Sequence, residues 1–459
     1  MKTHQLILLT TVLFITLFYG EDTGINVGIL GVATALLTFF HTPETRRTRT
    51  FLILFVTTIL SSVAFAWYGD FVSFLATFTS CFLLIFHSRN SSLKSILVIP
   101  VFAFNFVTFP VRVFRFDQWL PKANISESLK KLVASVLIPA GFVVVFFGVY
   151  SLGSAHFSGI FDLYRLDFNL WEFFVLSCIG FFLAFNFWNF SIDNSLVTVN
   201  QKLDNDFSGT HSPKPTFSFL EFGAERKSGF ISFAALNLLL IIFLATFTYE
   251  QFFESAKTSA QLSAETHDRV NAVILSIVMA VLVIMFYFKG YFNFDPKARY
   301  LKIMAKIWIF LNVLLVLTAF TKNAEYVINL GFTYKRLGVF AFLILAFAGL
   351  LLTFIKIQRQ KTNAFLINHI VWYFYGTVLV CSYFNWGGFI TSQNLKRANF
   401  DLQYHHKSVN YNELQLLDYA GRERNLKLRQ QILSQIESEK SKTFLSGTLF
   451  YQNLRKLRN

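Results

Sequence analysis

The side chains in this sequence with the greatest scope for chemistry are polar groups inside or beside long apolar segments. They are Asn186, Asn189, Asn312, and the adjacent pair Asn368 and His369. Lipid offers a polar side chain no hydrogen-bond partner, so such groups must find partners within the protein or line a polar cavity. They indicate either a cavity for a substrate or ion, or hydrogen bonds between helices. For the uncharged asparagines we favour hydrogen bonds between helices.

A second group of candidate residues surrounds a junction between two apolar segments. Glu325 and Tyr326 precede it, and Gly331, Thr333 and Arg336 lead into the next apolar run. Glycine permits positive φ at a tight turn, and a threonine hydroxyl can cap the helix that follows. The arginine would lie one turn into that helix, where it could reach lipid head groups or a carboxylate. We therefore predict a contact between the side chains of Glu325 and Arg336.

Motifs that carry known enzyme chemistry are missing from the sequence. It contains no HExxH pair, no Walker A loop, no GxGxxG after a strand and no GxSxG elbow. The three cysteines form no CxxC pair, and the adjacent His405 and His406 lack the spacing of metal ligands. The sequence therefore identifies no catalytic residue, metal ligand or cofactor. It favours a protein that is not an enzyme without deciding the point.

Composition and apolar patterning indicate how these residues are positioned. Of 459 residues, 54% are hydrophobic and 15% charged, against roughly 25% charged in soluble chains. The apolar residues fall in blocks of about 15 to 25, the length that crosses a bilayer core. We predict an all-α fold, a polytopic helical membrane protein with about 11 or 12 transmembrane helices and a short helical C-terminal tail. The bundle would occupy residues 1–390 and the tail residues 391–459.

One segment, residues 96–114, leaves the number of spans open. The other expected spans are residues 6–19, 25–40, 51–68, 71–86, 132–152, 170–190, 229–248, 270–288, 303–320, 337–355 and 364–386. Residues 96–114 are long enough to cross but contain Pro100, Pro110 and Arg112. If this segment is re-entrant or interfacial, most basic loops share one side and the tail lies outside, as the positive-inside rule favours. If it crosses, the tail is cytoplasmic.

Glycine spacing near the N-terminus predicts close helix packing. Gly24 and Gly28 are four residues apart, and Gly31 follows one turn later, a pattern that lets two helices approach closely. We expect this hairpin to pack within its own bundle rather than to form a dimer.

The tail has a different character from the rest of the chain. It is basic, and its leucines and isoleucines recur at helical spacing, which predicts short amphipathic helices. Such a tail could lie on lipid head groups, bind a partner or fold on the bundle, and we give folding on the bundle the most weight. The net charge of +15 is typical of basic loops at an anionic leaflet. We expect membrane lipids as partners, and a protein partner through the tail, but no nucleic acid.

Residues 322–343, KNAEYVINLGFTYKRLGVFAFL, carry a family resemblance. They resemble a junction between two late spans in the bacterial membrane family called domain of unknown function 4153, which has a sibling family 4173. That junction reads Tyr-Gly-Leu-Thr-x-x-Arg; here Gly331, Thr333 and Arg336 match it, and Phe332 replaces the usual leucine. The resemblance implies a multi-pass protein of a bacterial cell (inner) membrane and brings no established activity.

Three functions are compatible with these observations. The first is a non-enzymatic scaffold, sensor or complex subunit whose tail and basic loops engage a partner. The alternative is a transporter or lipid-handling protein with a polar cavity among the late spans, formed by Asn312, Asn368, His369 and Arg336. The absence of Asp and Glu from the centres of the expected spans speaks against proton- or sodium-coupled transport. The third is a transferase acting on lipid-linked substrates, with residues 193–206 as its candidate loop.

Overall fold

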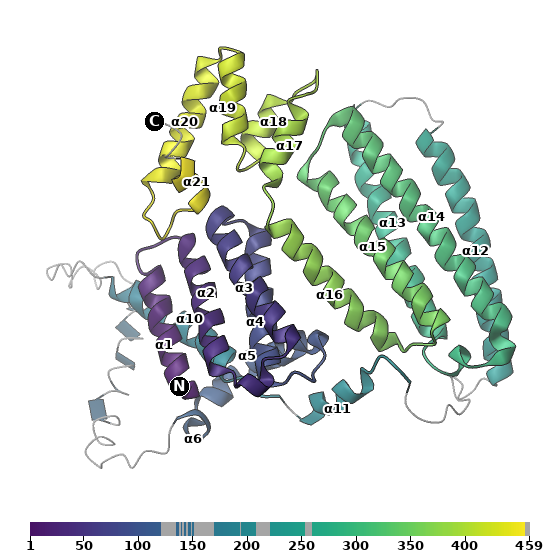
Figure 1. The fold of residues 1–459 in the computed structure, drawn as a ribbon, viewed down its shortest axis with the longest axis horizontal. Helices are drawn as coiled ribbons and strands as arrows, with labels where there is room; N and C mark the ends of the chain where they lie inside the picture. The colour runs from purple at the N-terminus through teal and green to yellow at the C-terminus, as the bar shows by residue number, and fades with distance from the viewer. Residues whose placement is uncertain are drawn as a thin grey trace.

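The computed structural model describes residues 1–120, 169–192, 194–207, 221–252 and 259–454, with isolated positions between 135 and 150. The expected span at 132–152 therefore falls mostly outside the described residues. Every regular element in the described part is a helix (Figure 1). Eight described helices are long and apolar enough to cross a membrane, and Thr3–Phe18, Ile25–His41 and Ala272–Tyr287 are shorter apolar helices. The predicted all-α polytopic membrane fold is confirmed.

The first bundle consists of α1 (Thr3–Phe18), α2 (Ile25–His41), α3 (Arg49–Tyr68), α4 (Phe71–Arg89) and α10 (Leu170–Trp188). Short connections join α1, α2, α3 and α4 in succession, so these neighbours pack antiparallel, while α10 comes from later in the chain and packs on α1. The side chains of Thr48 and Asp70 accept hydrogen bonds at the N-termini of α3 and α4, where helix N–H groups have no partner of their own.

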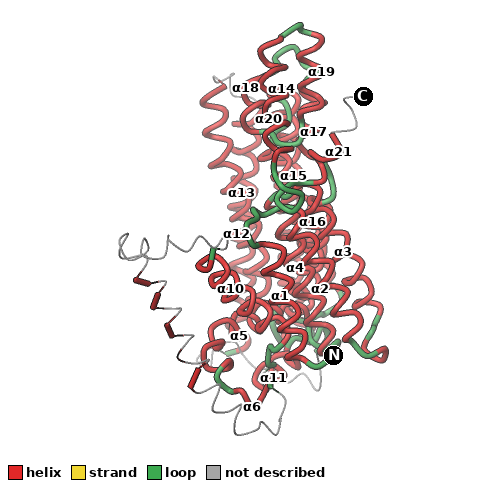
Figure 2. The backbone as a smooth tube through the Cα atoms, turned by 90° about the vertical axis from the view of Figure 1, so that its left-hand side faces the viewer, coloured by secondary structure: helices red, strands yellow, loops and turns green. Residues whose placement is uncertain are grey.

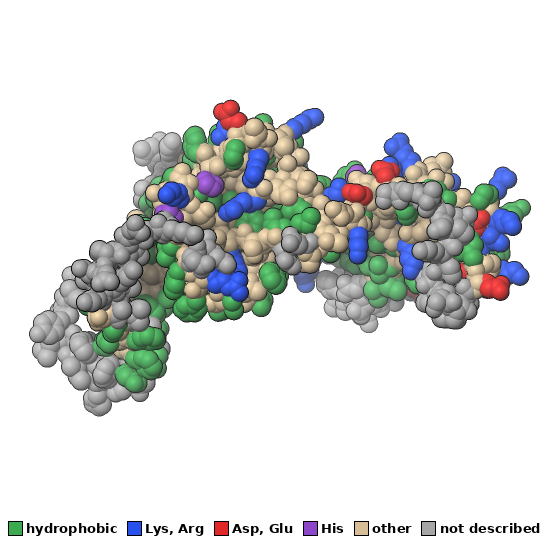
Figure 3. All heavy atoms as spheres, turned by 90° about the horizontal axis from the view of Figure 1, so that it is seen from below, with side chains coloured by type: hydrophobic (Ala, Val, Ile, Leu, Met, Phe, Trp, Pro, Cys, Tyr) green, Lys and Arg blue, Asp and Glu red, His purple; other side chains and the backbone are tan. Residues whose placement is uncertain are grey.

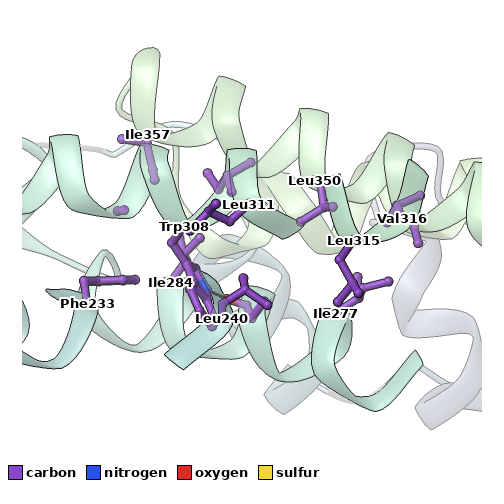
Figure 4. Close-up of a cluster of buried hydrophobic side chains, with 14 of the residues drawn as sticks. Phe233, Leu240, Ile277, Ile284, Trp308, Leu311, Leu315, Val316, Leu350 and Ile357 are labelled. Atoms are coloured by element: carbon purple, nitrogen blue, oxygen red, sulfur yellow. Dashed lines mark hydrogen bonds between the residues drawn. The ribbon is translucent and has the colours of Figure 1, made fainter. Parts of the chain in front are cut away.

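The second bundle consists of α12 (Phe222–Phe252), α13 (Ser259–Tyr287), α14 (Arg299–Leu330) and α15 (Tyr334–Gln358). Its core is a continuous cluster of large buried side chains that point toward one another from neighbouring helices (Figure 4). They include Phe233, Leu240, Ile284, Trp308, Leu315 and Leu350.

Helix α16 (Asn363–Ser382) joins the two bundles by packing on α4 and on α15. The hydroxyl of Tyr375 on α16 lies 2.8 Å from that of Thr57 and 2.7 Å from that of Ser80. These two hydrogen bonds tie α16 to α3 and α4 of the first bundle.

Helix α5 (Val98–Val113), which follows a short 3₁₀ turn, packs along the second half of α10. The ring of Phe102 lies 4.9 Å from that of Phe190, and the ring of Phe109 lies 4.8 Å from that of Phe182. The chain then turns at α6 (Phe116–Trp119), and the Trp119 ring returns to within 5.5 Å of the Phe185 ring. Residues Ser95–Val113 are among the eight helices long and apolar enough to cross a membrane, so both alternatives for residues 96–114 stay predictions.

The tail forms a small helical layer at the end of the first bundle and beside the end of the second (Figure 1, Figure 2). Its helices are α17 (Trp386–Asn394), α18 (Leu402–Ser408), α19 (Glu413–Arg422), α20 (Leu426–Ser441) and α21 (Leu449–Asn453). Their apolar side chains make a core of their own, which also packs on aromatic side chains at the end of α3. Helix α17 begins before the expected domain boundary at residue 391.

The tail folds on the bundle, the arrangement that we weighted most. The backbone N–H of Ile25 donates to the carbonyl of Gly447 at 2.9 Å, and that of Asn26 donates to the carbonyl of Leu445 at 3.2 Å. A Cβ on Gly24 would collide with the backbone of Ser446 and Gly447. This glycine therefore lets the tail approach the turn between α1 and α2.

Candidate functional site

The junction, residues 331–336, has the local structure that the sequence predicts. Gly331 ends α14 with φ +84°, a conformation that favours glycine. The Thr333 side chain caps α15 by accepting a hydrogen bond from the backbone N–H of Arg336 at 3.3 Å. The guanidinium of Arg336 donates to the carbonyl of Gly331 at 2.6 Å, which satisfies an unpaired carbonyl at the end of α14.

The predicted contact between Glu325 and Arg336, both described residues, is wrong. Glu325 instead forms an ion pair with Lys322 at 2.8 Å. Lys322 lies three residues earlier on the same helix, where side chains are neighbours. The same ammonium also lies 5.4 Å from the centre of the Tyr326 ring.

The tail holds the junction through two side chains. The Asn394 amide accepts a hydrogen bond from the backbone N–H of Phe332 at 2.7 Å and donates one to its carbonyl at 2.9 Å. A Cβ on Gly331 would lie 2.7 Å from the Asn394 Oδ1 atom, so glycine is required for this pairing. Arg397 donates to three carbonyls at the end of α14: Val327, Ile328 and Asn329.

A buried histidine completes this connection. Asn394 Nδ2 donates to His405 Nε2 at 3.0 Å, so the neutral ring carries its proton on Nδ1 and donates to Thr391 Oγ1 at 3.0 Å. Asn412 Nδ2 donates to the same threonine oxygen at 2.8 Å. Burial lowers the pKa of His405 to about 4, while the charge of Asp401 acts weakly in the opposite direction. Of the adjacent His405 and His406, His405 therefore has a structural role: its ring links Asn394 to Thr391.

The other candidate residues lie apart from the junction, in three separate places. Asn312 is fully buried in the second bundle and donates to the Trp308 carbonyl of its own helix at 2.8 Å. Asn368 lies at the end opposite the tail and donates to Leu203 and Asn205. His369 Nδ1 lies 2.7 Å from the carbonyl of Phe365.

The two early asparagines lie at the C-terminal end of α10, and Asn186 contacts α5. Asn186 is fully buried, and its Oδ1 accepts a hydrogen bond from Arg112 at 3.1 Å. Asn189 is the last residue of the α10 cap, with its backbone N–H donating to the carbonyl of Phe185. The structure therefore does not bring the ten candidate residues into one cavity.

A cleft of about 720 Å³ lies between α15 and α16 on the tail side of the molecule. Its long walls are apolar and include the rings of Phe340, Trp372 and Phe384. At Gly338 on α15 and Gly376 on α16, no atom lies within 4 Å of where a Cβ would be. The absence of side chains at these glycines leaves the space between the two helices.

The end of the cleft nearest the tail is polar. It is lined by Tyr68 at the end of α3, Asp70 at the start of α4, Tyr334 from the junction, and Asn385 and Tyr411 from the tail region. The Asn385 amide donates to the backbone carbonyl of Tyr411 at 3.0 Å, which holds the loop before α19 over the cleft. The arrangement is amphipathic: an apolar slot that ends in hydroxyl groups, an amide and one carboxylate.

Sequence reasoning missed this cleft because its lining comes from four separated parts of the chain. The signals that could have pointed to it are the glycines at positions 338 and 376 within apolar spans and the concentration of aromatic residues near 372–386. Small residues in membrane spans more often serve close helix packing, so glycines at these positions do not by themselves indicate a cleft.

Sequence reasoning also missed a buried charge in the second bundle. Lys356 on α15 is fully buried, and its ammonium donates to the carbonyl of Phe288 at 2.7 Å. That carbonyl lies just beyond the end of α13, where a cation is favoured by the helix dipole. Lys356 therefore serves the packing of α13 against α15. Within the described ranges, no group of three or more His, Cys, Asp or Glu side chains could hold a metal ion.

Comparison with known proteins gives one match. The family model of a domain of unknown function, DUF4153, matches residues 50–419. No curated protein and no solved structure matches the chain. The matched range begins in α3 and ends in α19, so it includes the junction, the cleft and much of the tail. The resemblance at the junction is confirmed: this chain belongs to the family DUF4153.

Proposed function

We propose that this chain is a lipid-handling membrane protein that holds one amphipathic molecule in the cleft between α15 and α16. The observation that carries the proposal is the cleft itself. Its volume of about 720 Å³ lies within the range of about 300–1,000 Å³ for small-molecule sites. Its apolar walls and polar end match a molecule with an apolar chain and a polar head group.

The position of the cleft supports entry from the bilayer. Ile344 and Val380, which line its rim, are 62% and 64% exposed, and both lie within helices that are long and apolar enough to cross a membrane. Water gains little from filling a slot of this kind, because the walls offer few hydrogen-bond partners. A lipid chain fits it without that penalty.

The distribution of charge supports an orientation. The end opposite the tail carries Lys and Arg side chains across its surface (Figure 3). They come from the connecting segments at that end and include Arg46, Arg47, Lys94, Arg359 and Lys361. By the positive-inside rule this end would face the cytoplasm. The tail and the polar end of the cleft would then lie at the outer surface of a bacterial inner membrane.

The proposal is tested by filling the cleft. In the Gly376→Trp variant the indole would occupy the space between α15 and α16. The matched control is Phe374→Trp, since Phe374 is 52% exposed and does not line the cleft. Native mass spectrometry of the gently solubilised full chain should show a bound lipid in the wild type and the control, and its loss in Gly376→Trp. Equal lipid binding by all three proteins would contradict the proposal.

A complex subunit is the second candidate function. The observation that favours it is a pair of exposed basic side chains in the first turn of α20, Lys427 and Arg429. Reversing both charges to glutamate should release a protein partner in co-purification, and an unchanged partner list would exclude this surface. Deleting the tail is a poor test, because the tail forms hydrogen bonds with the junction and with the α1–α2 turn.

The transferase hypothesis gains no support. Asp193 lies outside the described residues, and Asp204 and Asp206 form ion pairs with Lys94 and Lys361 at the ends of neighbouring helices. These two carboxylates hold the connecting segments together.

A further inference from the structure

We infer that the cleft selects a phospholipid whose head group carries an ammonium, with the carboxylate of Asp70 as its counter-charge. This inference rests on the proposed function and names the class of lipid. Among the residues that line the cleft, all of them described, Asp70 is the one with a charged side chain. A single carboxylate at the polar end of an apolar slot attracts a cation and repels an anion.

The carboxylate of Asp70 is available for such a partner. Its Oδ1 atom accepts hydrogen bonds from the backbone N–H and the hydroxyl of Ser73, at 2.8 and 2.7 Å, as the cap of α4. Its Oδ2 atom has no hydrogen-bond partner, and the side chain forms no ion pair, among the described residues. One oxygen is therefore held by the fold, and the other is left to a ligand.

Aromatic rings beside the carboxylate add to the preference for a cation. The rings of Tyr68 and Tyr411 lie 5.4 Å apart, edge to face, and both residues line the cleft beside Asp70. Burial raises the pKa of Tyr411, and the nearby charge of Asp70 raises it further. Both the carboxylate and the phenol line the cleft, and tyrosine faces also attract ammonium groups.

The phosphate of such a lipid has partners of its own. The hydroxyls of Tyr68 and Tyr411 have no hydrogen-bond partner among the described residues and can donate to a phosphate oxygen. Neither lysine nor arginine lines the cleft. A lipid with a net negative head group would therefore meet an uncompensated carboxylate. In a zwitterionic lipid, the phosphate would accept hydrogen bonds from the tyrosine hydroxyls and the ammonium would pair with the carboxylate of Asp70.

The test separates the charge of Asp70 from its role as a helix cap. Asparagine caps helices about as well as aspartate, so Asp70→Asn removes the charge and keeps the fold. The control is Asp418→Asn, which removes an exposed carboxylate that pairs with Arg422 on α19. The full chain is equilibrated with equal amounts of phosphatidylethanolamine and phosphatidylglycerol, and native mass spectrometry gives the ratio of the two lipids bound.

The wild type and Asp418→Asn should bind phosphatidylethanolamine in about tenfold preference, the effect of one charge-assisted hydrogen bond. Asp70→Asn should lose that preference. Asp70→Ser, which also retains a cap, should lose it too if the asparagine variant does not fold. A wild type with bound lipid but no head-group preference, or an Asp70→Asn variant that keeps the preference, would overturn this inference and leave the proposed function standing. Lipid binding that Gly376→Trp does not affect would overturn both.

Discussion

The contact between α2 and α3 in the first bundle and the core of the second bundle solve the problem of helix packing in different ways. Helices α2 and α3 approach closely at small residues: a Cβ on Gly28 would lie 2.6 Å from the carbonyl oxygen of Ser62, and one on Gly31 would collide with the Ser62 hydroxyl. In the second bundle large apolar side chains such as Phe233, Trp308 and Leu315 fill the space between helices. Lipid provides no hydrophobic driving force between helices, so both solutions depend on tight packing.

The hydroxyl groups of the first bundle show what its small residues contribute. Ser62 donates to the carbonyl of Thr58, and Thr58 donates to that of Leu54, at 2.7 and 2.6 Å within the same helix. Because these hydroxyls form hydrogen bonds within their own helix, they add no bond between helices. These residues contribute to the packing through their small side chains, which let α2 and α3 approach closely. The glycines at 28 and 31 pack within their own chain, as the sequence predicts.

The largest effect should come from the second bundle. Replacing the fully buried Leu315 with alanine should lower the free energy of unfolding by about 2–4 kcal/mol, because the neighbouring side chains lose their contacts around a cavity. The adjacent Leu314, 36% exposed, is the control and should cost far less. Thermal unfolding in detergent measures both, and equal losses would show that this core is not tightly packed.

The first bundle should respond most strongly to added volume. Gly28→Ala should destabilise the chain by about 1–3 kcal/mol, since the new methyl group forces α2 away from α3. Gly349→Ala in α15, where no atom lies within 4 Å of a Cβ, should be neutral or stabilising by up to about 1 kcal/mol. If both variants unfold at the same temperature, the contrast between the bundles is wrong.

The tail packs on both bundles. Its packing should depend on pH. The pKa of His405 in the folded chain is about 4, below its ordinary value of about 6.5. The unfolded chain therefore binds more protons, so stability is complete above about pH 6.5 and falls as pH drops toward 4, by on the order of 1–2 kcal/mol.

The matched variants for this prediction are His405→Gln and His406→Gln, followed by thermal unfolding from pH 7.5 to 4.5. The first should lose part of the pH dependence, and the second should keep it. Burial raises the pKa of Glu413, which acts in the opposite direction in every variant. The difference in pH dependence between the two variants therefore measures the contribution of His405. Identical pH profiles would show that His405 does not contribute.

The smallest effect should come from the hydroxyl groups. Ser62→Ala keeps the close approach of α2 and α3 and removes a bond within one helix, so it should change the free energy of unfolding by about 0.5 kcal/mol or less. Ser62→Leu, by contrast, would add volume beside Gly31 and should resemble the Gly28→Ala variant. A large loss of unfolding free energy in Ser62→Ala would contradict this prediction and show that the hydroxyl stabilises the fold.

The features that could be predicted from sequence are those set by neighbouring residues. Span length and apolarity predict the helices. The turn at Gly331 follows from the positive φ that glycine permits, and the cap at Thr333 follows from a hydrogen bond to the backbone three residues later. The pairing of Glu325 with Arg336 failed because Lys322, a closer helical neighbour, takes the carboxylate. The cleft and the pairing of Asn394 with Phe332 depend on side chains more than 60 positions apart, which no local pattern reveals.

The contact between the α1–α2 turn and residues 445–447 has a consequence for biosynthesis. Ile25 and Asn26 emerge from the ribosome early, yet the carbonyls that accept their N–H groups belong to Leu445 and Gly447, which are made more than 400 residues later. The turn between α1 and α2 therefore lacks these partners until residue 447 has been synthesised.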